Sequence, residues 1–429
     1  MEVKAGYKQT DIGVIPEDWQ VKPLTGLAAI LHGFGFQSQY FTSFGNFRLT
    51  TPGHFHEEGG FRDLGDKQKY YDGPLPSGYL LNKGDMIVAM TEQADGLLGS
   101  AALVPISGTY LHNQRLGKVK ILSSELSIRY LYLVFNSRGY RAKVRETAAG
   151  TKVKHTSPTK LLEIPIPIPP TIAEQEAIAE ALSDADALIE ALEQLLAKKR
   201  QVKQGAMQEL LTGKRRLPGF SGKWEVKTLG ELGEITGAGV DKKIRSDEEP
   251  VRLVNYLDVY HRDFIYSKDL NHWVSAPSAQ LKRCAVRKGD IFFTPSSEMP
   301  YDIAISAIAM EDISDAAYSY HVVRLRLNEE NDWNLAFRTY IFKTRYFLSQ
   351  AETMCEGSGK RYVITLKRFR ELKVYFPSDV KEQTAIAEIL SDMDAEIAAL
   401  EGKLSKAREV KAGMMSVLLT GKVRLKPKP

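Results

Sequence analysis

The chain contains one long segment twice, and this repetition constrains its fold more than any other feature. Residues 174–217 and 382–425 align without a gap at an offset of 208, with about two-thirds of the paired positions identical. Repetition at a fixed period is the sign of an architecture built from equivalent units. The period is too long for a solenoid and there are only two copies. The sequence therefore predicts a molecule made of two equivalent halves.

Each copy has the pattern of a long helix with a narrow apolar seam. Thr171 and Glu174 predict a capping box at the start of the first copy, and Asp379 and Glu382 predict one at the start of the second. The apolar residues then follow a 4-3-4-3-4 spacing, which is typical of a coiled coil. They are Ile178, Leu182, Ala185, Ile189, Leu192 and Leu196, and Ile386, Leu390, Met393, Ile397, Leu400 and Leu404. Gly213 and Gly421 are natural helix stops.

The order of the segments along the chain predicts how the two helices pair. About 40 residues give a helix of roughly 60 Å. The first helix leads into a new globular segment and the second begins where that segment ends, so the seams can meet only if the helices run antiparallel. We therefore expect a globular region at each end of a rod. Inserting about four residues near Leu195 should then change the spacing of the two regions or abolish their joint function.

The two globular segments share a fainter pattern. Residues 19–24 match residues 224–229 as Trp-x-Val-Lys-x-Leu, and Lys83-Gly84-Asp85 matches Lys288-Gly289-Asp290. Short apolar runs predict strands at 86–90, 101–104, 291–294 and 303–309, and the segments 128–144 and 335–351 each predict one helix. The predicted fold is α+β and pseudo-two-fold symmetric. Two sheet-rich domains, at 1–170 and 217–378, are separated by two long antiparallel coiled-coil helices, at 171–216 and 379–429, the latter including a basic tail.

Composition excludes several protein classes. The longest apolar stretches fall short of the ~20 residues that span a bilayer, and the N-terminus lacks the apolar core of a signal peptide. The two cysteines, Cys284 and Cys355, argue against a disulfide framework or a zinc site, so we expect a cytoplasmic protein without a membrane partner. The net charge of +5 is mild, but basic residues cluster near 138–154 and 338–370, at corresponding places in the two halves. Their recurrence favours a polyanion surface over solvated helix faces.

The motifs of common enzymes are absent from the sequence. It has no GxGxxG, P-loop, CxxC or HExxH pattern, and no Asn-Pro-Pro-aromatic motif of adenine methyltransferases. The cluster His54-Phe-His56-Glu57 is the best candidate for metal ligands, but a polar loop is the favoured interpretation. Asp85 and Asp290 are better explained as turn residues than as catalytic acids. We therefore predict no catalytic residue, no metal site and no enzymatic activity of the chain itself.

Taken together, these features match a known family. The twice-used PPTIAEQ…LSDAD…LLTGK block, the Trp-x-Val-Lys-x-Leu motifs and the N-terminal YKQTDIGVIPEDW resemble, over the whole chain, the specificity (S) subunit of Type I restriction-modification systems. The resemblance implies that each globular domain is a target-recognition domain for half of a split DNA sequence. It further implies that the helices space these domains and dock two methyltransferase subunits, which restriction subunits join. S-adenosyl methionine, ATP and Mg²⁺ would belong to these partners, whose complex acts as an adenine methyltransferase and an ATP-dependent endonuclease.

The resemblance and the charge pattern together suggest site residues. Lys152, Lys154, Lys360 and Arg361 lie in Gly/Thr/Ser-rich loops at equivalent places and are candidates for DNA-backbone contact. Gln114 and Arg115 are of the residue types that recognise base edges, although His112–Arg115 is also explained as a structural turn. The candidates for the spacer or for partner binding lie at the helix starts. They are Glu174, Gln175, Ile178 and Leu182, and Glu382, Gln383, Ile386 and Leu390.

Two other functions stay open. A coiled-coil scaffold that presents two protein-binding modules would explain the helices but not the paired basic loops. A self-contained nuclease or methyltransferase is disfavoured by the missing motifs. DNA affinity that falls steeply with salt would exclude the scaffold.

Overall fold

The computed structural model describes residues 4–92, 96–328 and 333–425. The chain divides into two compact units, one formed by residues 1–192 and 403–429 and the other by residues 193–402. Each unit thus contains one globular region, the beginning of one long helix and the end of the other. We call residues 4–170 the first region and residues 217–378 the second region. The end of the predicted basic tail, residues 426–429, lies outside the described residues.

The first region is built from short strands and a few helices. Its strands are β1 (Tyr7–Thr10), β2 (Gly13–Pro16), β3 (Gln20–Lys22), β4 (Ala28–His32), β5 (Phe41–Thr42), β6 (Phe47–Leu49), β7 (Tyr70–Tyr71), β8 (Met86–Ala89), β9 (Thr91–Glu92), β10 (Ala101–Leu103), β11 (Tyr110–Leu111), β12 (Leu116–Ile121), β13 (Lys154–His155) and β14 (Ile166–Ile168). Its helices are α1 (Ile128–Phe135), α2 (Arg138–Glu146) and α3 (Pro158–Glu163), with 3-10 turns η1 (Ser38–Tyr40), η2 (Pro52–His54) and η3 (Gly65–Lys67). The central sheet has the order β10-β8-β12-β4 and is antiparallel.

The second region follows the same plan. Its strands are β15 (Trp224–Thr228), β16 (Gly233–Thr236), β17 (Glu249–Val254), β18 (Phe264–Ile265), β19 (Trp273–Ala276), β20 (Ala285–Val286), β21 (Ile291–Phe293), β22 (Ser296–Ser297), β23 (Ser306–Ala309), β24 (Ile313–Tyr318), β25 (Val323–Leu327), β26 (Glu356–Ser358), β27 (Arg361–Val363) and β28 (Lys373–Pro377). Its helices are α5 (Leu229–Leu232), α6 (Tyr256–Tyr260), α7 (Ser278–Cys284), α8 (Leu335–Ile341), α9 (Arg345–Met354) and α10 (Leu366–Glu371), with η4 (Ser267–Asp269) and η5 (Pro300–Asp302).

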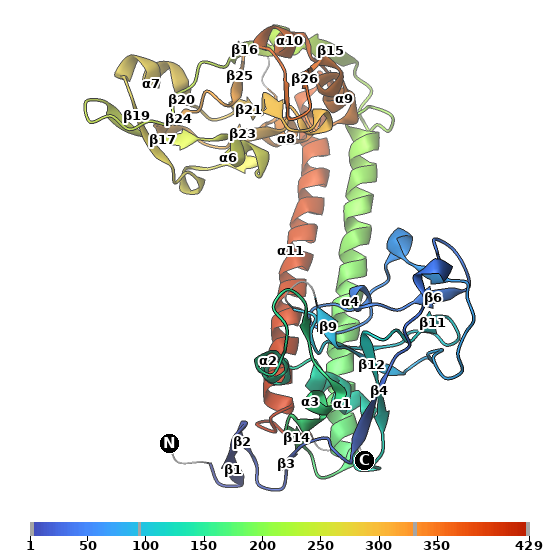
Figure 1. Ribbon diagram of the computed structural model, residues 1–429. Coiled ribbons are helices and arrows are strands. Elements are labelled where there is room, and N and C mark those ends of the chain that lie inside the picture. Colours follow the sequence, from blue (N-terminus) through green and yellow to red (C-terminus); the bar gives the residue numbers. More distant parts are fainter. Residues whose placement is uncertain (1–3, 93–95, 329–332, 426–429) are drawn as a thin grey trace. The chain divides into compact units, whose positions relative to one another are not determined.

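The central sheets of the two regions correspond strand by strand. The order β23-β21-β25-β16 in the second region repeats β10-β8-β12-β4 in the first, and β18 is added beside β23. β8 and β21 are fully buried, as expected for apolar strands at the middle of a sheet. In the first region α1 packs against β10 and α3 against β4 (Figure 1). The predicted α+β class and the predicted similarity of the two regions are confirmed.

The Lys-Gly-Asp motifs form structural turns, as predicted. Gly84 and Gly289 adopt φ +85° and +84°, a conformation that favours glycine. The Asp85 carboxylate accepts the amide of Asn82 and pairs with Lys118 on β12 at 2.6 Å. The Asp290 carboxylate likewise accepts the amide of Arg287 and pairs with Arg326 on β25. Each aspartate therefore ties a turn to the central strand beside it.

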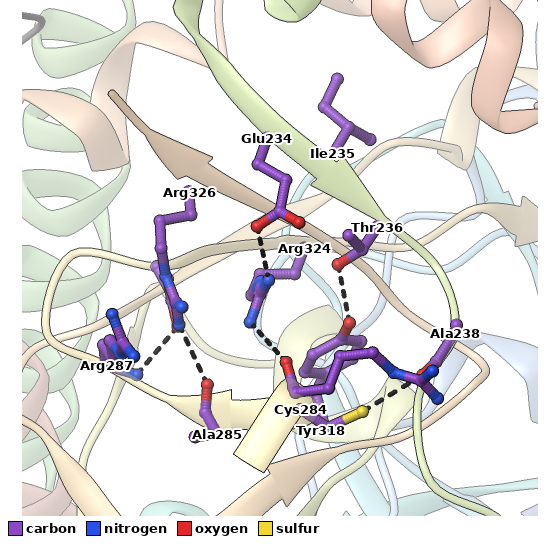
Figure 2. Close-up of polar contacts among 12 residues, drawn as sticks. Glu234, Ile235, Thr236, Ala238, Cys284, Ala285, Arg287, Tyr318, Arg324 and Arg326 are labelled. Carbon is purple, nitrogen blue, oxygen red and sulfur yellow. Dashed lines mark hydrogen bonds and ion pairs between the residues drawn. The ribbon is translucent and has the colours of Figure 1, made fainter. Parts of the chain in front are cut away.

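In the second region a polar cluster lies between the two apolar cores (Figure 2). The buried Arg324 guanidinium donates to Glu234 at 3.1 Å and to the carbonyl of Arg283 at 3.2 Å. Arg326 donates to the carbonyl of Ala285 at 3.0 Å. Both carbonyls lie at the C-terminal end of α7, where helix carbonyls lack partners within the helix and favour cations. The two arginines of β25 thereby fix α7 on the central sheet.

The long helices have the same boundaries in both copies. α4 spans Ile172–Leu210 and α11 spans Val380–Leu418, so both ends repeat at the offset of 208. Gly213 and Gly421 follow these ends with φ of +66° and +67°, which confirms the predicted stops. Every predicted seam position is buried or half-buried, whereas most of the intervening residues are exposed. None of the helices in the described ranges is apolar enough over sufficient length to span a bilayer.

The helix segments inside each unit run antiparallel. In the unit formed by residues 193–402, Lys199 pairs with Glu396 at 2.6 Å, and Lys203, one turn further on, pairs with Asp394. In the other unit Lys411 pairs with Asp186 at 2.5 Å. Exposed pairs of this kind add at most ~1 kcal/mol each, so the apolar seam carries most of the stability. The ion pairs show which residues face each other across the two helices, and the predicted antiparallel pairing is confirmed within each unit.

Two local predictions were wrong. The segments 128–144 and 335–351 each form two helices, because the side chains of Ser137 and Thr344 accept backbone amides and start new helices there. The predicted capping boxes form only in half. Thr171 accepts the amide of Glu174 at 3.2 Å, but the Glu174 carboxylate bonds the Arg424 guanidinium instead of the helix start. Glu382 bonds Arg216 in the same way.

Candidate nucleic-acid interface

In the first region, the turn His112–Arg115 between β11 and β12 is held against the loop that follows β4. The Phe34 amide donates to the carbonyl of His112 at 2.8 Å, and the Gln114 amide donates to the carbonyl of Phe34 at 3.0 Å. His112 and Asn113 are buried, and the His112 ring contacts the carbonyl of Leu116 at 3.0 Å. Gln114 and Arg115 are exposed. The first half of the turn is therefore structural, and the second half presents two polar side chains to solvent.

The hairpin 149–155 lies next to this turn, and Met90 connects them. The Met90 amide donates to the carbonyl of Arg115 at 3.1 Å, and the Met90 carbonyl accepts the amide of Thr156 at 3.0 Å. The hairpin closes through two bonds between Ala149 and His155. Lys152 is exposed at its tip, and Lys154 is half-buried in β13 opposite Glu92. The structure thus brings Gln114, Arg115, Lys152 and Lys154 to neighbouring segments.

The second region repeats the turn with the same backbone bonds and different side chains. The Val240 amide donates to the carbonyl of Tyr318 at 2.8 Å, and the Tyr320 amide donates to the carbonyl of Val240 at 3.2 Å. The bridge between Val240 and Ser319 matches the one between Phe34 and Asn113, both at an offset of 206 residues. Tyr320 therefore occupies the place of Gln114, and His321 that of Arg115. Their rings contact each other with centroids 3.9 Å apart.

The second hairpin also repeats the first. β27 pairs with β22 as Ser296↔Val363 and Ser297↔Tyr362, the equivalent of Thr91↔His155 and Glu92↔Lys154. By this register Lys360 is the counterpart of Lys152. Arg361 corresponds to Val153, and Lys154 corresponds to Tyr362. Lys360 and Arg361 are both exposed near the tip between β26 and β27.

Positive charge gathers around the turn of the second region. The pKa of His321 lies below its ordinary value, first because of its partial burial and then because of the nearby charges of Lys242 and Arg361. Lys242 follows Val240 closely, and Asp241 between them acts in the opposite direction on the pKa of His321. The loop and the hairpin therefore each bring one cation near the His321 ring. Three segments far apart in the sequence thereby form one basic surface that also carries the aromatic ring of Tyr320, 48% exposed.

Four basic residues at the turns and hairpins of the two regions lack ion partners among the described residues, whereas most of the other basic residues in the two sequence clusters are bound within the fold. Arg115, Lys152, Lys360 and Arg361 have no ion pair with any residue that the structure describes. Other basic residues of the clusters are engaged inside the fold. The buried Arg141 donates to the carbonyls of Gly96, Leu98 and Glu57, Lys143 pairs with Glu146, Lys343 with Asp263, and Arg368 with Glu356. These four charges without ion partners lie on or next to the exposed turns and hairpins of the two regions.

The eight residues predicted at the helix starts are all buried within the protein. Glu174, Gln175, Ile178 and Leu182 and their copies Glu382, Gln383, Ile386 and Leu390 are at most 5% exposed. Gln175 accepts the amide of Ser127 at 2.8 Å, and Gln383 accepts the amide of Asn334 at 3.0 Å. These contacts anchor each helix to the region of its own unit. They leave none of the eight side chains on an exposed surface.

The histidine cluster considered for a metal is structural in part. The buried His54 ring contacts the Gln68 side chain at 2.7 Å and the Thr51 amide at 3.1 Å, and burial lowers its pKa. No group of three or more His, Cys, Asp or Glu side chains suited to a metal ion occurs in the described ranges. The polar-loop interpretation of this segment therefore fits the geometry.

Sequence reasoning missed the contribution of Lys242, Tyr320 and His321. A glycine signals the place in both halves, since a side chain on Gly33 or Gly239 would meet the backbone of Asn113 or Ser319 within about 2.3 Å. Only glycine allows the loop to pass so close to the turn. The flanking sequences share little else, and the correspondence emerges only from the backbone bonds.

Comparison with known proteins gives a consistent result. A family model described as "Type I restriction modification DNA specificity domain" matches the chain twice, at residues 16–201 and 221–408. The Type I restriction enzyme MjaVIII specificity subunit of Methanocaldococcus jannaschii is 26% identical over 347 residues, which cover 72% of this chain and 76% of that protein. The putative MjaX specificity subunit of the same organism is 26% identical over 98% of this chain and 97% of its own length.

Two solved structures show the same fold. The S subunit of a Type I restriction-modification system from M. genitalium aligns with a TM-score of 0.55 and 16% identity over 97% of this chain and 98% of its own. A chain from a study of complex assembly and conformational transition of the type I R-M system aligns with a TM-score of 0.58 and 15% identity, covering 95% and 99% of the two chains. At these identities the likeness concerns the fold alone.

Proposed function

Because the chain belongs to the family of Type I restriction-modification specificity subunits, we propose that each of its two regions recognises one part of a split double-stranded DNA target. The chain thereby directs partner methyltransferase and restriction subunits to that target. The chain itself forms and breaks no bonds, in keeping with the non-catalytic character of this family.

The observation that carries this proposal is the repeated turn. The same backbone hydrogen bonds hold Gln114 and Arg115 in one region and Tyr320 and His321 in the other. A constant frame with different exposed side chains suits two recognition surfaces for different base sequences. Base edges in the major groove are distinguished by polar side chains such as glutamine and arginine, each good contact contributing ~1–3 kcal/mol of discrimination. The target should therefore be asymmetric, with an unread gap between its halves.

The unpaired cations supply the second part of the argument. Lys152, Lys360 and Arg361 are exposed near hairpin tips and lack ion partners among the described residues. Lysine and arginine in such positions neutralise DNA phosphates and set the register of a protein on the duplex without choosing bases. Lys154, in the same strand pair, is a further candidate for this role.

The partners supply the chemistry in this proposal. Two methyltransferase subunits would bring S-adenosyl methionine, and restriction subunits would bring the ATP- and Mg²⁺-dependent steps. The helix surfaces left exposed by the seam are the candidate docking sites, because the anchoring residues at the helix starts are buried. The spacer role of α4 and α11 is a prediction of the same kind, and insertion near Leu195 tests it.

The direct test is to express the chain with its cognate methyltransferase subunit in cells that lack other modification systems and to map the methylated adenines. We expect one asymmetric two-part sequence. Methylation could instead depend on this chain but occur at a single uninterrupted sequence. That result would contradict the two-part target.

Salt dependence separates this function from that of a protein-binding scaffold. The affinity of the complex for its target should fall by at least tenfold between 50 and 200 mM salt, since several phosphate contacts release counterions. A flat salt profile would favour the scaffold. Changing Lys152 and Lys360 together should flatten the slope without altering the methylated sequence.

A further inference from the structure

The loop between β22 and β23 of the second region exposes two apolar side chains. Met299 is 46% exposed and Tyr301 is 63% exposed, although Ile303 and Ala304, which follow directly, are fully buried. The loop covers residues 298–302 and contains the 3-10 turn η5. Exposed apolar residues are common singly, but two on one short loop call for an explanation.

The loop is held firmly at both ends. Before it, the carbonyl of Ser296 accepts the Tyr256 hydroxyl at 2.9 Å. After it, the Ala304 amide donates to the carbonyl of Thr294 at 3.0 Å, and Ala304 adopts φ +59°, a strained value for a residue with a Cβ. The Tyr260 hydroxyl donates to the Asp302 carboxylate within the loop itself. Met299 and Tyr301 are therefore exposed on an ordered loop, and a ligand would find them in place.

The loop emerges beside the unpaired cations. β22 leads directly into it, and β22 is hydrogen-bonded to β27, which begins at Arg361. Arg361 thus lies on the three-stranded sheet β22-β27-β26 from which the loop projects, and Lys360 lies in the turn between β26 and β27. An apolar pair flanked by cations is the composition that proteins present to DNA when they contact bases between phosphate contacts.

In the first region, the part of the corresponding loop that the structure describes is bound by a buried carboxylate. The buried Glu92 carboxylate accepts the amides of Gly96, Leu97 and Leu98 at 2.7–3.1 Å. Arg141 of α2 donates to the carbonyls of Gly96 and Leu98. In the part of this loop that the structure describes, residues 96–98, the side chains are half-buried or buried. At the place of Glu92 the second region has Ser297, which has no carboxylate to bind the loop in this way, and Met299 and Tyr301 are exposed there.

We propose that Met299 and Tyr301 contact the bases of the half-target read by the second region and help to determine its sequence. This inference rests on the proposed function. Apolar side chains select thymine through its methyl group or insert between base steps that unstack easily. Since the loop is already ordered, little conformational entropy is lost when it meets DNA.

The test uses the full chain with its methyltransferase subunit and compares four forms. They are the parent, Met299→Ser with Tyr301→Ser, Tyr301→Phe, and Val226→Ser as the matched control. Val226 is 53% exposed on β15, which pairs with β28 and not with the loop. For each form the methylated sequences are mapped, and the affinity for the parent target and for targets altered in either half is measured.

We expect the double serine variant to lose at least tenfold discrimination at one or two positions of one half-target. The other half, the salt slope and the melting temperature should stay as in the parent. Tyr301→Phe and Val226→Ser should keep the parent pattern. Unchanged discrimination in both halves would overturn the inference.

Two further outcomes are informative. In one outcome the double variant binds the parent target with the same affinity and the same discrimination against altered targets but no longer supports methylation. The loop then contacts a protein subunit, and the inference fails. If the parent itself methylates no two-part sequence, the proposed function fails first, and the result is distinct from a failure of the loop alone. Should the double variant be unstable, the single variants Met299→Ser and Tyr301→Ser decide the question.

Discussion

The first and second regions share their backbone connections more closely than their side chains. The bridges Phe34↔Asn113 and Val240↔Ser319 are equivalent, and so are the strand pairs β9–β13 and β22–β27. Yet the exposed side chains on these elements differ at nearly every position, from Gln114 and Arg115 to Tyr320 and His321. A frame held by backbone bonds and glycines tolerates changes of exposed side chains. Two exposed surfaces can therefore diverge on one fold without loss of stability.

Acid should break the equivalence of the two regions most strongly. His112 is buried in the first region, and burial lowers its pKa to about 4, while His54 shifts in the same direction. Between pH 6.5 and 4 the unfolded chain binds a proton at His112 that the folded chain does not bind. The free energy of unfolding therefore decreases by up to ~3 kcal/mol as the pH is lowered through this range. At pH 5, where carboxylates are mostly still ionised, about 2 kcal/mol of this loss should already be present.

Hydrogen exchange resolved by region measures this effect. Lowering the pH from 7.5 to 5 should increase the local opening of the first region more than that of the second region. The exchange rates are first corrected for the intrinsic rate at each pH. The second region has His321, whose pKa is also lowered, but this ring is less buried than that of His112 and should contribute less. His112→Gln, which cannot titrate, should reduce the difference between the regions. Equal opening of both regions would contradict the assignment.

The two arginine–glutamate anchors differ in how easily they can be broken. Glu382 is 1% exposed and receives two bonds from Arg216, at 2.6 and 2.7 Å. Arg424 contacts Glu174 equally closely but also bonds Asp18 at 2.8 and 2.9 Å. We expect Glu382→Gln to cost ~2 kcal/mol and Glu174→Gln only ~1 kcal/mol, because Arg424 keeps a carboxylate partner.

Local exchange of amides near the start of each long helix should report this difference. The variant Asp18→Asn serves as the control, since combined with Glu174→Gln it should raise the loss in the first unit to that seen in the second. If the two single glutamate changes had equal effects, Asp18 would make no contribution to the anchor.

The repeated turns should act independently on the two halves of the target. Gln114→Ala with Arg115→Ala should relax recognition of one half by about tenfold per lost base contact, roughly 1.4 kcal/mol each. Tyr320→Ala with His321→Ala should relax only the other half. Mapping of methylated sites with each pair of changes measures both effects. Relaxation of both halves by one pair would show that the turns do not act separately.

How far the sequence predicts this structure depends on the range of the interactions. The seam from Ile178 to Leu196 and the stops at Gly213 and Gly421 follow from local patterns and were predicted correctly. The partner of Glu174 could not be predicted, because Arg424 is 250 residues away in the chain. The break at Ser137 was missed because apolar residues on either side continue a helical pattern.

For the candidate site, too, local sequence patterns predict some of the residues, and contacts between distant segments determine the others. Lys152 and Lys360 could be matched from the sequence because both follow glycine-containing motifs at an offset of 208. Lys154 and Arg361 were also predicted from these equivalent loops, and the strand register shows that Arg361 corresponds to Val153 and Lys154 to Tyr362. The proximity of Lys242, His321 and Arg361 depends on three segments that are far apart in the sequence, so no local pattern predicts it.

The smallest effect we expect comes from the hairpin lysines, where the two regions are most alike. Lys152 and Lys360 occupy equivalent positions and have no ion partners among the described residues. Lys152→Ala and Lys360→Ala should each weaken binding about threefold near physiological salt and lower the salt slope by about one, with the same methylated sequence. Titrations of the complex with its target at several salt concentrations measure both quantities. The two variants could instead differ in the salt dependence of their affinity, or one of them could change the methylated sequence. Either result would mean that the two lysines have different contacts with DNA and that the hairpin tips of the two regions are not equivalent.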